Sequence, residues 1–122
     1  MSASKGRSAR NKGKRGERDV RDLFIRDFGL DARRGGNQSR DASNEADVEG
    51  TPWWVEVKRS ARPSPRKALE QAQEATDGRM PIAVTWKDRE GVIVTVSWKS
   101  FVELSSYWLA EKLRTQGDIK SE

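Results

Sequence analysis

The sequence feature that most constrains the fold is the alternating pattern at residues 53–58, WWVEVK. Successive side chains of a strand point to opposite faces of a sheet. Val55 and Val57 therefore share one face, and two valines at this spacing predict that this face lies against the core. Glu56 and Lys58 share the other face. The pattern thus predicts a carboxylate and an ammonium group side by side on one strand.

The other patterns predict an α/β fold. The predicted helices are residues 16–28, 64–78 and 99–114. The predicted strands are residues 30–34, 46–49, 53–58, 81–86 and 92–98, with a Gly- and Ser-rich loop at 35–45. A mixed sheet with helices packed on it accommodates this order of elements. The last helix is expected to close the fold through the apolar residues Phe101, Leu104, Trp108 and Leu113.

The chain has 122 residues, which fits one domain, and it contains neither His nor Cys. This excludes disulfides, zinc fingers, iron–sulfur clusters, thiol nucleophiles and Ser-His-Asp triads. Catalysis would rest on carboxylates, lysine, hydroxyls or amides, and a metal site would use oxygen ligands, which favours Mg²⁺ or Mn²⁺. Because no stretch approaches the ~20 apolar residues of a membrane span and the N-terminus lacks the apolar core of a signal peptide, we expect a cytoplasmic protein.

Positive charge is concentrated at the N-terminus. Residues 1–40 contain 12 Lys and Arg against 5 Asp and Glu, whereas the whole chain has a net charge of +5. Residues 1–15 lack large apolar side chains beyond Met1, so we expect a flexible basic tail there and a folded domain over residues 16–122. Such a tail either attracts nucleic acid phosphates or only increases solubility.

Three acids and a lysine form the candidate site. Asp47 and Glu56 lie on the predicted hairpin, whose strands are ~5 Å apart, so their carboxylates can share one cation. Water and a backbone carbonyl, for which Val57 is the candidate, would complete the ligands of a hard divalent ion. Lys58 can orient or help deprotonate a bound water, or stabilise the transition state, and Glu17 can ligate through water. Taken singly, these residues also fit an ordinary exposed strand and a favourable first-turn Glu.

These residues resemble a known family of nucleases. A-D-V at residues 46–48, followed by V-E-V-K at 55–58, resembles the PD-(D/E)xK nuclease superfamily. K-G-K-R-G-E-R-D-V at residues 12–20 is similar to the start of archaeal and phage Holliday junction resolvases of that superfamily, and the resemblance covers about residues 12–105. Ala46 replaces the motif's Pro, which has no chemical role.

The resemblance implies a restriction-endonuclease-like αβββαβ core with an added strand and a C-terminal helix. It makes Asp47 and Glu56 the metal ligands of Mg²⁺ or Mn²⁺, Lys58 the catalytic lysine and Glu17 the first-helix acid. It also implies a glutamine near the attacking water or the scissile phosphate. Gln71 is the favoured candidate for this glutamine, and Gln73 is its rival.

Two basic groups flank the candidate site in sequence, which favours phosphate binding over ordinary surface charge. Trp54 shares the face of Glu56 and Lys58, where it can stack on a base, line the site or lie in a subunit interface. The expected DNA-binding residues are Arg18, Arg33, Arg34, Arg40, Arg59, Arg62, Arg66, Lys67 and Trp54.

Together these observations predict a Mg²⁺-dependent, structure-selective DNA endonuclease, with a four-way junction as the favoured substrate. A symmetric junction needs two cuts, so a homodimer with two sites is expected. Two alternatives remain open. One is another nuclease of the same superfamily, such as a flap-cutting repair enzyme or a restriction-like enzyme. The other is a basic, non-catalytic DNA-binding protein on this fold.

Overall fold

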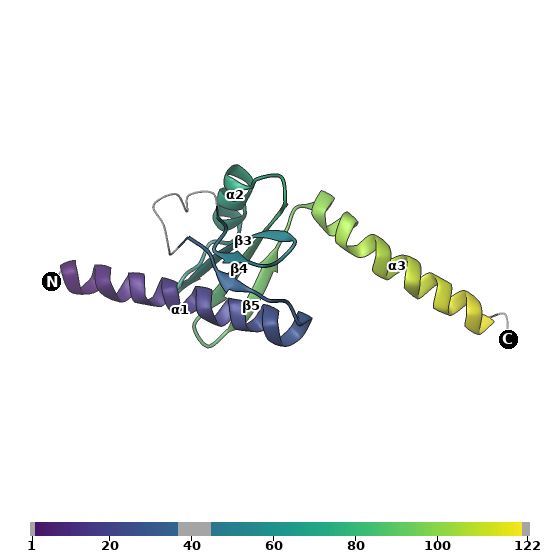
Figure 1. The fold of residues 1–122 in the computed structure, drawn as a ribbon, viewed down its shortest axis with the longest axis horizontal. Coiled ribbons are helices and arrows are strands. Elements are labelled where there is room, and N and C mark those ends of the chain that lie inside the picture. The colour runs from purple at the N-terminus through teal and green to yellow at the C-terminus, as the bar shows by residue number, and fades with distance from the viewer. Residues whose placement is uncertain (1, 37–44, 121–122) are drawn as a thin grey trace.

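The computed structural model describes residues 2–36 and 45–120, and its side chains from residue 11 to 36 and from 45 to 117. It contains a five-stranded mixed sheet and three helices (Figure 1). The elements are α1 (Ser2–Phe28), β1 (Arg33–Arg34), β2 (Val48–Glu49), β3 (Trp53–Ser60), α2 (Pro65–Ala75), β4 (Met80–Lys87), β5 (Gly91–Thr95) and α3 (Trp98–Lys120). The predicted order of elements and the mixed α/β sheet are confirmed.

Strand β3 lies at the centre of the sheet, whose strand order is β1-β2-β3-β4-β5. The pairing of β3 with β4 is parallel, and the other three pairings are antiparallel. Helix α2 connects the two parallel strands; it begins with the predicted Ser64 cap, whose hydroxyl accepts a hydrogen bond from the Lys67 N–H, and with Pro65 in its first turn. Central strand β3 is therefore paired with β4 from Trp53 to Ser60, whereas its pairing with β2 is at Val55.

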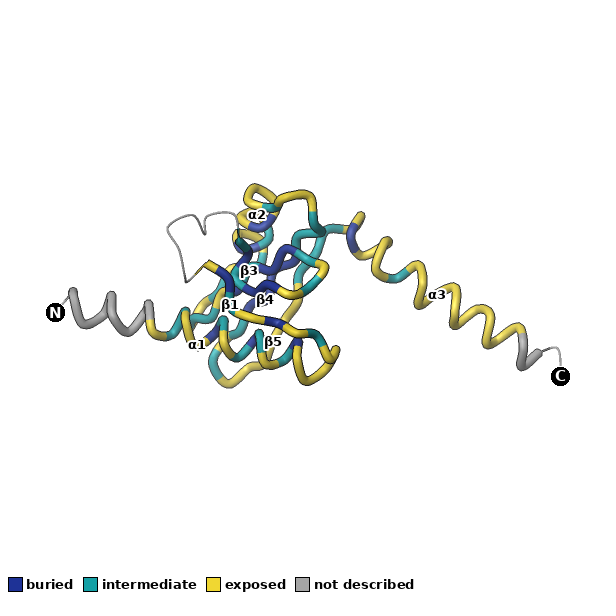
Figure 2. Tube along the Cα trace, in the orientation of Figure 1, coloured by how far each residue is buried: buried dark blue, intermediate teal, exposed yellow. Residues whose placement is uncertain are grey.

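The core lies on both faces of β3. On one face, Val55 and Val57 pack with Val20 and Phe24 of α1, which confirms the predicted core face. On the other face, Trp54 packs with Ala46 and with Ala72 of α2. Figure 2 shows buried segments in the middle of the sheet and exposed ones around it. Because one helix covers each face of β3, the strand is buried on both sides near its start.

Helix α1 begins at Ser2, so the predicted start at Gly16 is wrong and the expected tail, residues 1–15, is helical from Ser2 onward. Lys and Arg are good helix formers, and extending an existing helix costs less than starting one. An ion pair between Lys12 and Asp88, in the turn after β4, also fastens this part of the helix to the body. The first apolar residues of the pattern indicate where α1 begins to pack on the sheet. The helix itself begins earlier in the chain.

Helix α3 differs from the predicted closing helix. It starts at Trp98, which was expected to end the preceding strand, and it leads away from the sheet (Figure 1). Trp98 is 78% exposed and Trp108 is 62% exposed. The apolar pattern correctly predicted a helix, but it gave no information about what the helix packs against. Within the described residues, no helix combines the length and the apolar character needed to cross a membrane.

Gly35 lies where two backbone segments meet beside the candidate site. Its N–H donates a hydrogen bond of 3.0 Å to the Asp47 carbonyl, and a Cβ atom here would collide with the Ala46 carbonyl oxygen. Gly35→Ala is therefore expected to destabilise the protein by about 1–3 kcal/mol, the usual cost of overpacking. Urea unfolding measures this loss.

The control for this prediction is Gly13→Ala in α1. A Cβ at Gly13 meets no atom within 4 Å, so this substitution should be neutral or stabilise the helix by up to ~1 kcal/mol. Equal stabilities for the Gly35→Ala and Gly13→Ala variants would contradict the close approach at Gly35.

Candidate active site

Asp47 lies just before β2 and close to Glu56 of β3. Val48 pairs with Val55, and the charge of Asp47 is near enough to raise the pKa of Glu56. The Asp47 N–H donates to the Val55 carbonyl at 2.9 Å. The Val57 N–H in turn donates to Asp47 Oδ2 at 2.8 Å. The backbone of β3 therefore fixes the orientation of the Asp47 carboxylate.

Lys58 lies beside Glu56, as the alternating pattern predicts. Its Nζ is 3.5 Å from Glu56 Oε1, and the lysine side chain is 47% exposed whereas that of Glu56 is 15% exposed. The ammonium group is thus at the solvent side of the carboxylate. A basic group in this position is available to an incoming anion while it still contacts the acid.

Glu17 and Arg34 form an ion pair next to these residues. Arg34 donates from Nη2 at 3.1 Å and from Nε at 3.3 Å to Glu17 Oε2. Both side chains are partly buried, at 14% and 23% exposure for Arg34 and Glu17. The sequence analysis named both residues but not this pair, because 17 residues separate them and no local pattern connects them. With Oε2 held by Arg34, Glu17 has one oxygen left for other contacts.

The carboxylates of Glu17, Asp47 and Glu56 lie close enough to affect one another's pKa. Burial raises the pKa of Glu56, and repulsion from Asp47 raises it further. The pKa of Glu17 is raised by burial and by Asp47, against the opposing effect of Arg34. Burial also raises the pKa of Asp47, although the Val57 N–H and Lys58 oppose this. Partial neutralisation by Lys58 and Arg34 leaves a site that a cation would stabilise.

The oxygen donors fit Mg²⁺, which is held in proteins by one or two carboxylates together with water. Asp47 and Glu56 supply two carboxylates. The N–H and the C=O of one strand residue point to the same side, so the Val57 carbonyl faces the same edge as the N–H that binds Asp47. Over residues 2–36 and 45–120, no group of three or more acids is arranged to hold a metal ion. Two carboxylates and one strand carbonyl would leave the remaining positions of such an ion to water.

The predicted DNA-binding residues fall into three groups. Arg59 is ion-paired with Asp19 and Asp88, and its guanidinium stacks 4.6 Å from the centre of the Trp86 ring. This surrounding favours a structural role for Arg59. Arg33 is ion-paired with Glu45 at 3.3 Å, and Arg34 is held by Glu17. Arg33 is exposed although ion-paired, and Arg18, Arg62, Arg66 and Lys67 are exposed as well; Arg40 lies outside the described residues.

Trp54 does not reach solvent. It is 2% exposed, packs against Ala72 of α2 and has the Arg79 guanidinium 5.1 Å from its ring centre. The prediction that it stacks on a base is therefore wrong. Trp54 was placed on the face of Glu56 and Lys58, but near the start of β3 this face is covered as well.

Gln71 and Gln73 lie on different sides of α2, since two residues correspond to about 200° around a helix. Gln73 lines a hollow with Thr95, Val96 and Trp98, on the flank that faces β5. Gln71 is exposed on the opposite flank. This arrangement favours Gln71 as the glutamine on the side of the acids.

The sequence analysis also missed a buried ion pair that anchors the hairpin. Glu49 is 8% exposed, and it accepts hydrogen bonds from Arg79 at 2.8 Å and 3.0 Å and from the Ala46 N–H at 2.7 Å. These bonds fix the segment just before and after Asp47. No local sequence pattern predicted this ion pair, because Arg79 is 30 residues from Glu49.

Replacing Glu56 is expected to stabilise the metal-free protein. Glu56→Gln removes a charge that burial and Asp47 disfavour, so the melting temperature in EDTA at pH 7 should rise by a few degrees. Because the pKa of Glu56 is raised above the ordinary 4.5, the folded protein takes up this proton more readily than the unfolded chain. Wild type therefore gains stability as the pH falls through the raised pKa, and the advantage of Glu56→Gln should disappear below pH 4.5.

Thermal melts between pH 8 and pH 4 measure this difference. Glu70→Gln, on the exposed side of α2, is the matched control. Its melting temperature should equal that of wild type across this pH range. A Glu56→Gln variant that is less stable than wild type at pH 7 would contradict the repulsion described above.

No protein-family model, curated protein or solved structure matches this chain. The fold and the site together define an α/β protein that gathers two carboxylates and a lysine on and beside the central strand of a mixed sheet. An inference about function therefore depends on the chemistry of these side chains.

Proposed function

We propose that this protein is a Mg²⁺-dependent endonuclease that hydrolyses phosphodiester bonds of branched DNA, with a four-way junction as its substrate. The observation that carries the proposal is the group formed by Asp47, which is held by the Val57 N–H at 2.8 Å, and Glu56, which has the Lys58 ammonium 3.5 Å away. Hydrolysis of a phosphodiester needs a way to activate water and a way to stabilise added negative charge. A chain without His or Cys must obtain both from carboxylates, lysine and a hard cation.

Each residue has a defined role in this proposal. Asp47, Glu56 and the Val57 carbonyl hold the cation, and Asp47 is oriented for this by the Val57 N–H. When bound, Mg²⁺ supplies Lewis-acid stabilisation of the phosphate charge and lowers the pKa of water. Lys58 contributes a positive charge beside the reacting phosphate. Arg34 orients Glu17, and Gln71 contacts the water or the scissile phosphate from α2.

The choice of a branched substrate rests on the basic surface. The exposed basic residues Arg18, Arg62, Arg66 and Lys67 carry no base-reading pattern, so they favour recognition of the backbone and its shape over recognition of sequence. A symmetric junction requires two cuts, which implies a homodimer with one site per chain. Action on DNA of a bacterial cell or of a phage-infected host implies a cytoplasmic location.

A cleavage panel tests the proposal. End-labelled four-way junctions, three-way junctions, flaps and linear duplexes are incubated with the protein in Mg²⁺, Ca²⁺ or EDTA. The expected result is paired nicks in the four-way junction with Mg²⁺, binding without cleavage in Ca²⁺ and no cleavage in EDTA. Cleavage of linear duplex as fast as cleavage of the four-way junction would exclude selectivity for junctions, but it would still show nuclease activity.

A second candidate is a basic DNA-binding protein without catalysis. The 12 Lys and Arg among residues 1–40 favour it, since they fit DNA binding whether or not the acids are catalytic. This candidate predicts junction binding that does not depend on Mg²⁺ and no cleavage in Mg²⁺ or Mn²⁺. The same panel therefore distinguishes the two functions.

A further inference from the structure

Helix α3 has an apolar face that nothing in its own chain covers. At 100° per residue, most of the large apolar side chains fall within about half of the helix circumference, and Tyr107 lies on the other half. The opposite half carries Lys99, Glu103, Ser106 and Arg114. Helix α3 makes no extensive packing contact with another described element, and Figure 2 shows it exposed along nearly its whole described length. We define the apolar face of α3 as Trp98, Phe101, Leu104, Trp108, Leu109 and Leu113, all exposed.

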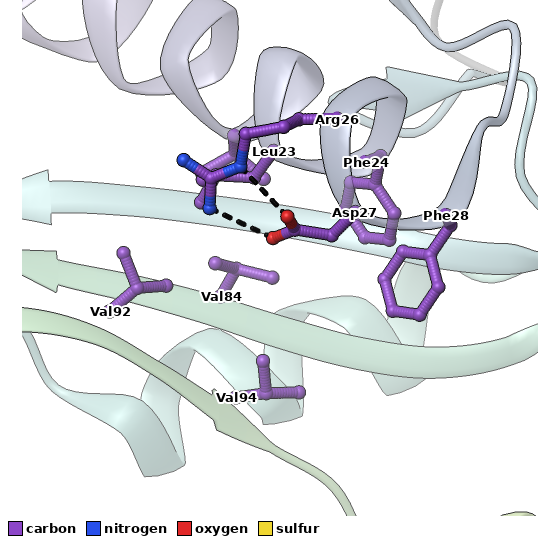
Figure 3. A pocket seen from close by; sticks show the side chains of 9 residues that line it. Leu23, Phe24, Arg26, Asp27, Phe28, Val84, Val92 and Val94 are labelled. Carbon is purple, nitrogen blue, oxygen red and sulfur yellow. Dashed lines mark hydrogen bonds and ion pairs between the residues drawn. The ribbon is translucent and has the colours of Figure 1, made fainter.

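A second uncovered apolar surface lies on the main body. Helix α1 covers β3 and β4 but not the edge strand β5, which leaves a hollow of about 350 Å³ between α1 and β5. In Figure 3, apolar side chains from both elements point toward this hollow, while Arg26 and Asp27 bind each other at its rim with hydrogen bonds of 2.8 Å and 3.0 Å. We define the α1–β5 groove as Leu23, Phe24, Phe28, Val84, Val92 and Val94.

The helix is held in a direction that keeps it off its own groove. Only Val96 and Ser97 lie between β5 and α3. Ser97 caps α3: its hydroxyl accepts a hydrogen bond of 3.1 Å from the Ser100 N–H, and its carbonyl accepts one of 2.9 Å from the Phe101 N–H. The cap therefore fixes the first turn of α3 directly at the end of this short connection, and α3 leads away from the sheet (Figure 1).

We propose that a second copy of this chain covers both surfaces, with the apolar face of α3 from each copy seated in the α1–β5 groove of the other. One two-fold exchange covers both apolar surfaces in both copies, which is the closed arrangement expected of a homodimer. Pairing of α3 with α3 alone would leave the groove open. On the α1 side of each sheet, the partner's helix then lies next to α1 and covers the edge strand.

The size of the apolar face agrees with a stable interface. Trp98, Phe101 and Trp108 are 78%, 52% and 62% exposed. Since an aromatic side chain buries about 150–250 Å², these three rings alone offer roughly 300–500 Å². A typical interface buries about 800 Å² per partner, which the aliphatic side chains and the polar rim can complete. The interface rests on the homodimer of the proposed function. The two failures are distinguishable, because light scattering measures the mass of the assembly whereas the cleavage panel measures nuclease activity.

Two double variants test the exchange. Phe101→Asp with Trp108→Asp places charges on the apolar face of α3, and Val92→Lys with Val94→Lys places charges in the α1–β5 groove. Light scattering should give wild type twice the 13.8 kDa mass of one chain, and each double variant the mass of one chain, with dimer affinity at least ~100-fold weaker. Ser106→Asp with Ala110→Asp adds the same charge to the polar face of α3 and should remain dimeric. Circular dichroism and melting curves verify that each variant is folded.

Mixing the two double variants makes the test specific for exchange. A mixed pair has one wild-type contact, between the intact α3 and the intact groove, and one contact between aspartates and lysines. The mixture should therefore form dimers although neither variant does so alone. A monomeric wild type would overturn the proposal, as would a groove variant that dimerises by itself, since the latter indicates α3–α3 pairing.

Discussion

Asp47→Asn is expected to reduce Mg²⁺-dependent cleavage of a four-way junction by at least about a thousandfold, because a metal site contributes several kcal/mol and each 1.4 kcal/mol is tenfold in rate. Asparagine keeps the size of the side chain and an oxygen that accepts the Val57 N–H bond, which is 2.8 Å long in the wild type. The fold should therefore remain intact. Junction binding in Ca²⁺ or EDTA should be retained or should improve, since one negative charge near the DNA is removed.

The control is Asp31→Asn, which changes an exposed aspartate just before β1. It should cleave at the wild-type rate. Because burial raises the pKa of Asp47, its carboxylate also takes up a proton at a higher pH than an ordinary aspartate. Wild-type cleavage should accordingly fall on acidification before the protein unfolds. Full cleavage by Asp47→Asn would exclude Asp47 as a metal ligand.

Trp54→Ala is expected to have the largest effect on stability, a loss of about 3–5 kcal/mol, which is the usual cost of removing a buried aromatic side chain. Trp54 is 2% exposed and fills the space between β3 and Ala72 of α2. This loss is a large part of the 5–15 kcal/mol by which domains are normally stable. Urea unfolding measures it, and the variant should be partly unfolded near 37 °C.

Trp54→Phe is the matched control. The Trp54 indole N–H is buried, and it has no hydrogen-bond partner among the described residues. Phenylalanine removes this unsatisfied donor while it keeps most of the apolar volume, so the loss should stay below ~1.5 kcal/mol. Junction affinity of Trp54→Phe should equal that of wild type. A strong loss of affinity without a loss of stability would restore Trp54 as a base-stacking residue.

Local patterns predicted those parts of the site that lie on one strand or one hairpin. The alternation in WWVEVK was enough to put Glu56 beside Lys58, and a short hairpin was enough to bring Asp47 near Glu56. The order of helices and strands followed from the same kind of pattern, since periodicity and turn residues act over a few positions. These are properties that neighbouring residues determine.

What the sequence did not predict depends on partners far along the chain. The pairing of Arg34 with Glu17 and of Glu49 with Arg79 joins separate elements, and no spacing rule relates them. Trp54 was misassigned because burial of the second face of β3 depends on where α2 packs. The position of α3 was wrong for the same reason, because an apolar helix face indicates that a partner exists without indicating which one.

The ion pair between Lys12 and Asp88 has a consequence for measuring DNA affinity. Salt weakens protein–DNA binding in proportion to the number of phosphates that the protein neutralises, and the slope of this dependence is commonly used to count them. The same salt screens a partly exposed ion pair such as this one. If the protein binds DNA as proposed, loosening α1 at high ionic strength would add to the slope, which would then count the α1 attachment together with the phosphate contacts. Asp88→Asn, which weakens this ion pair and keeps Lys12, should separate the two contributions.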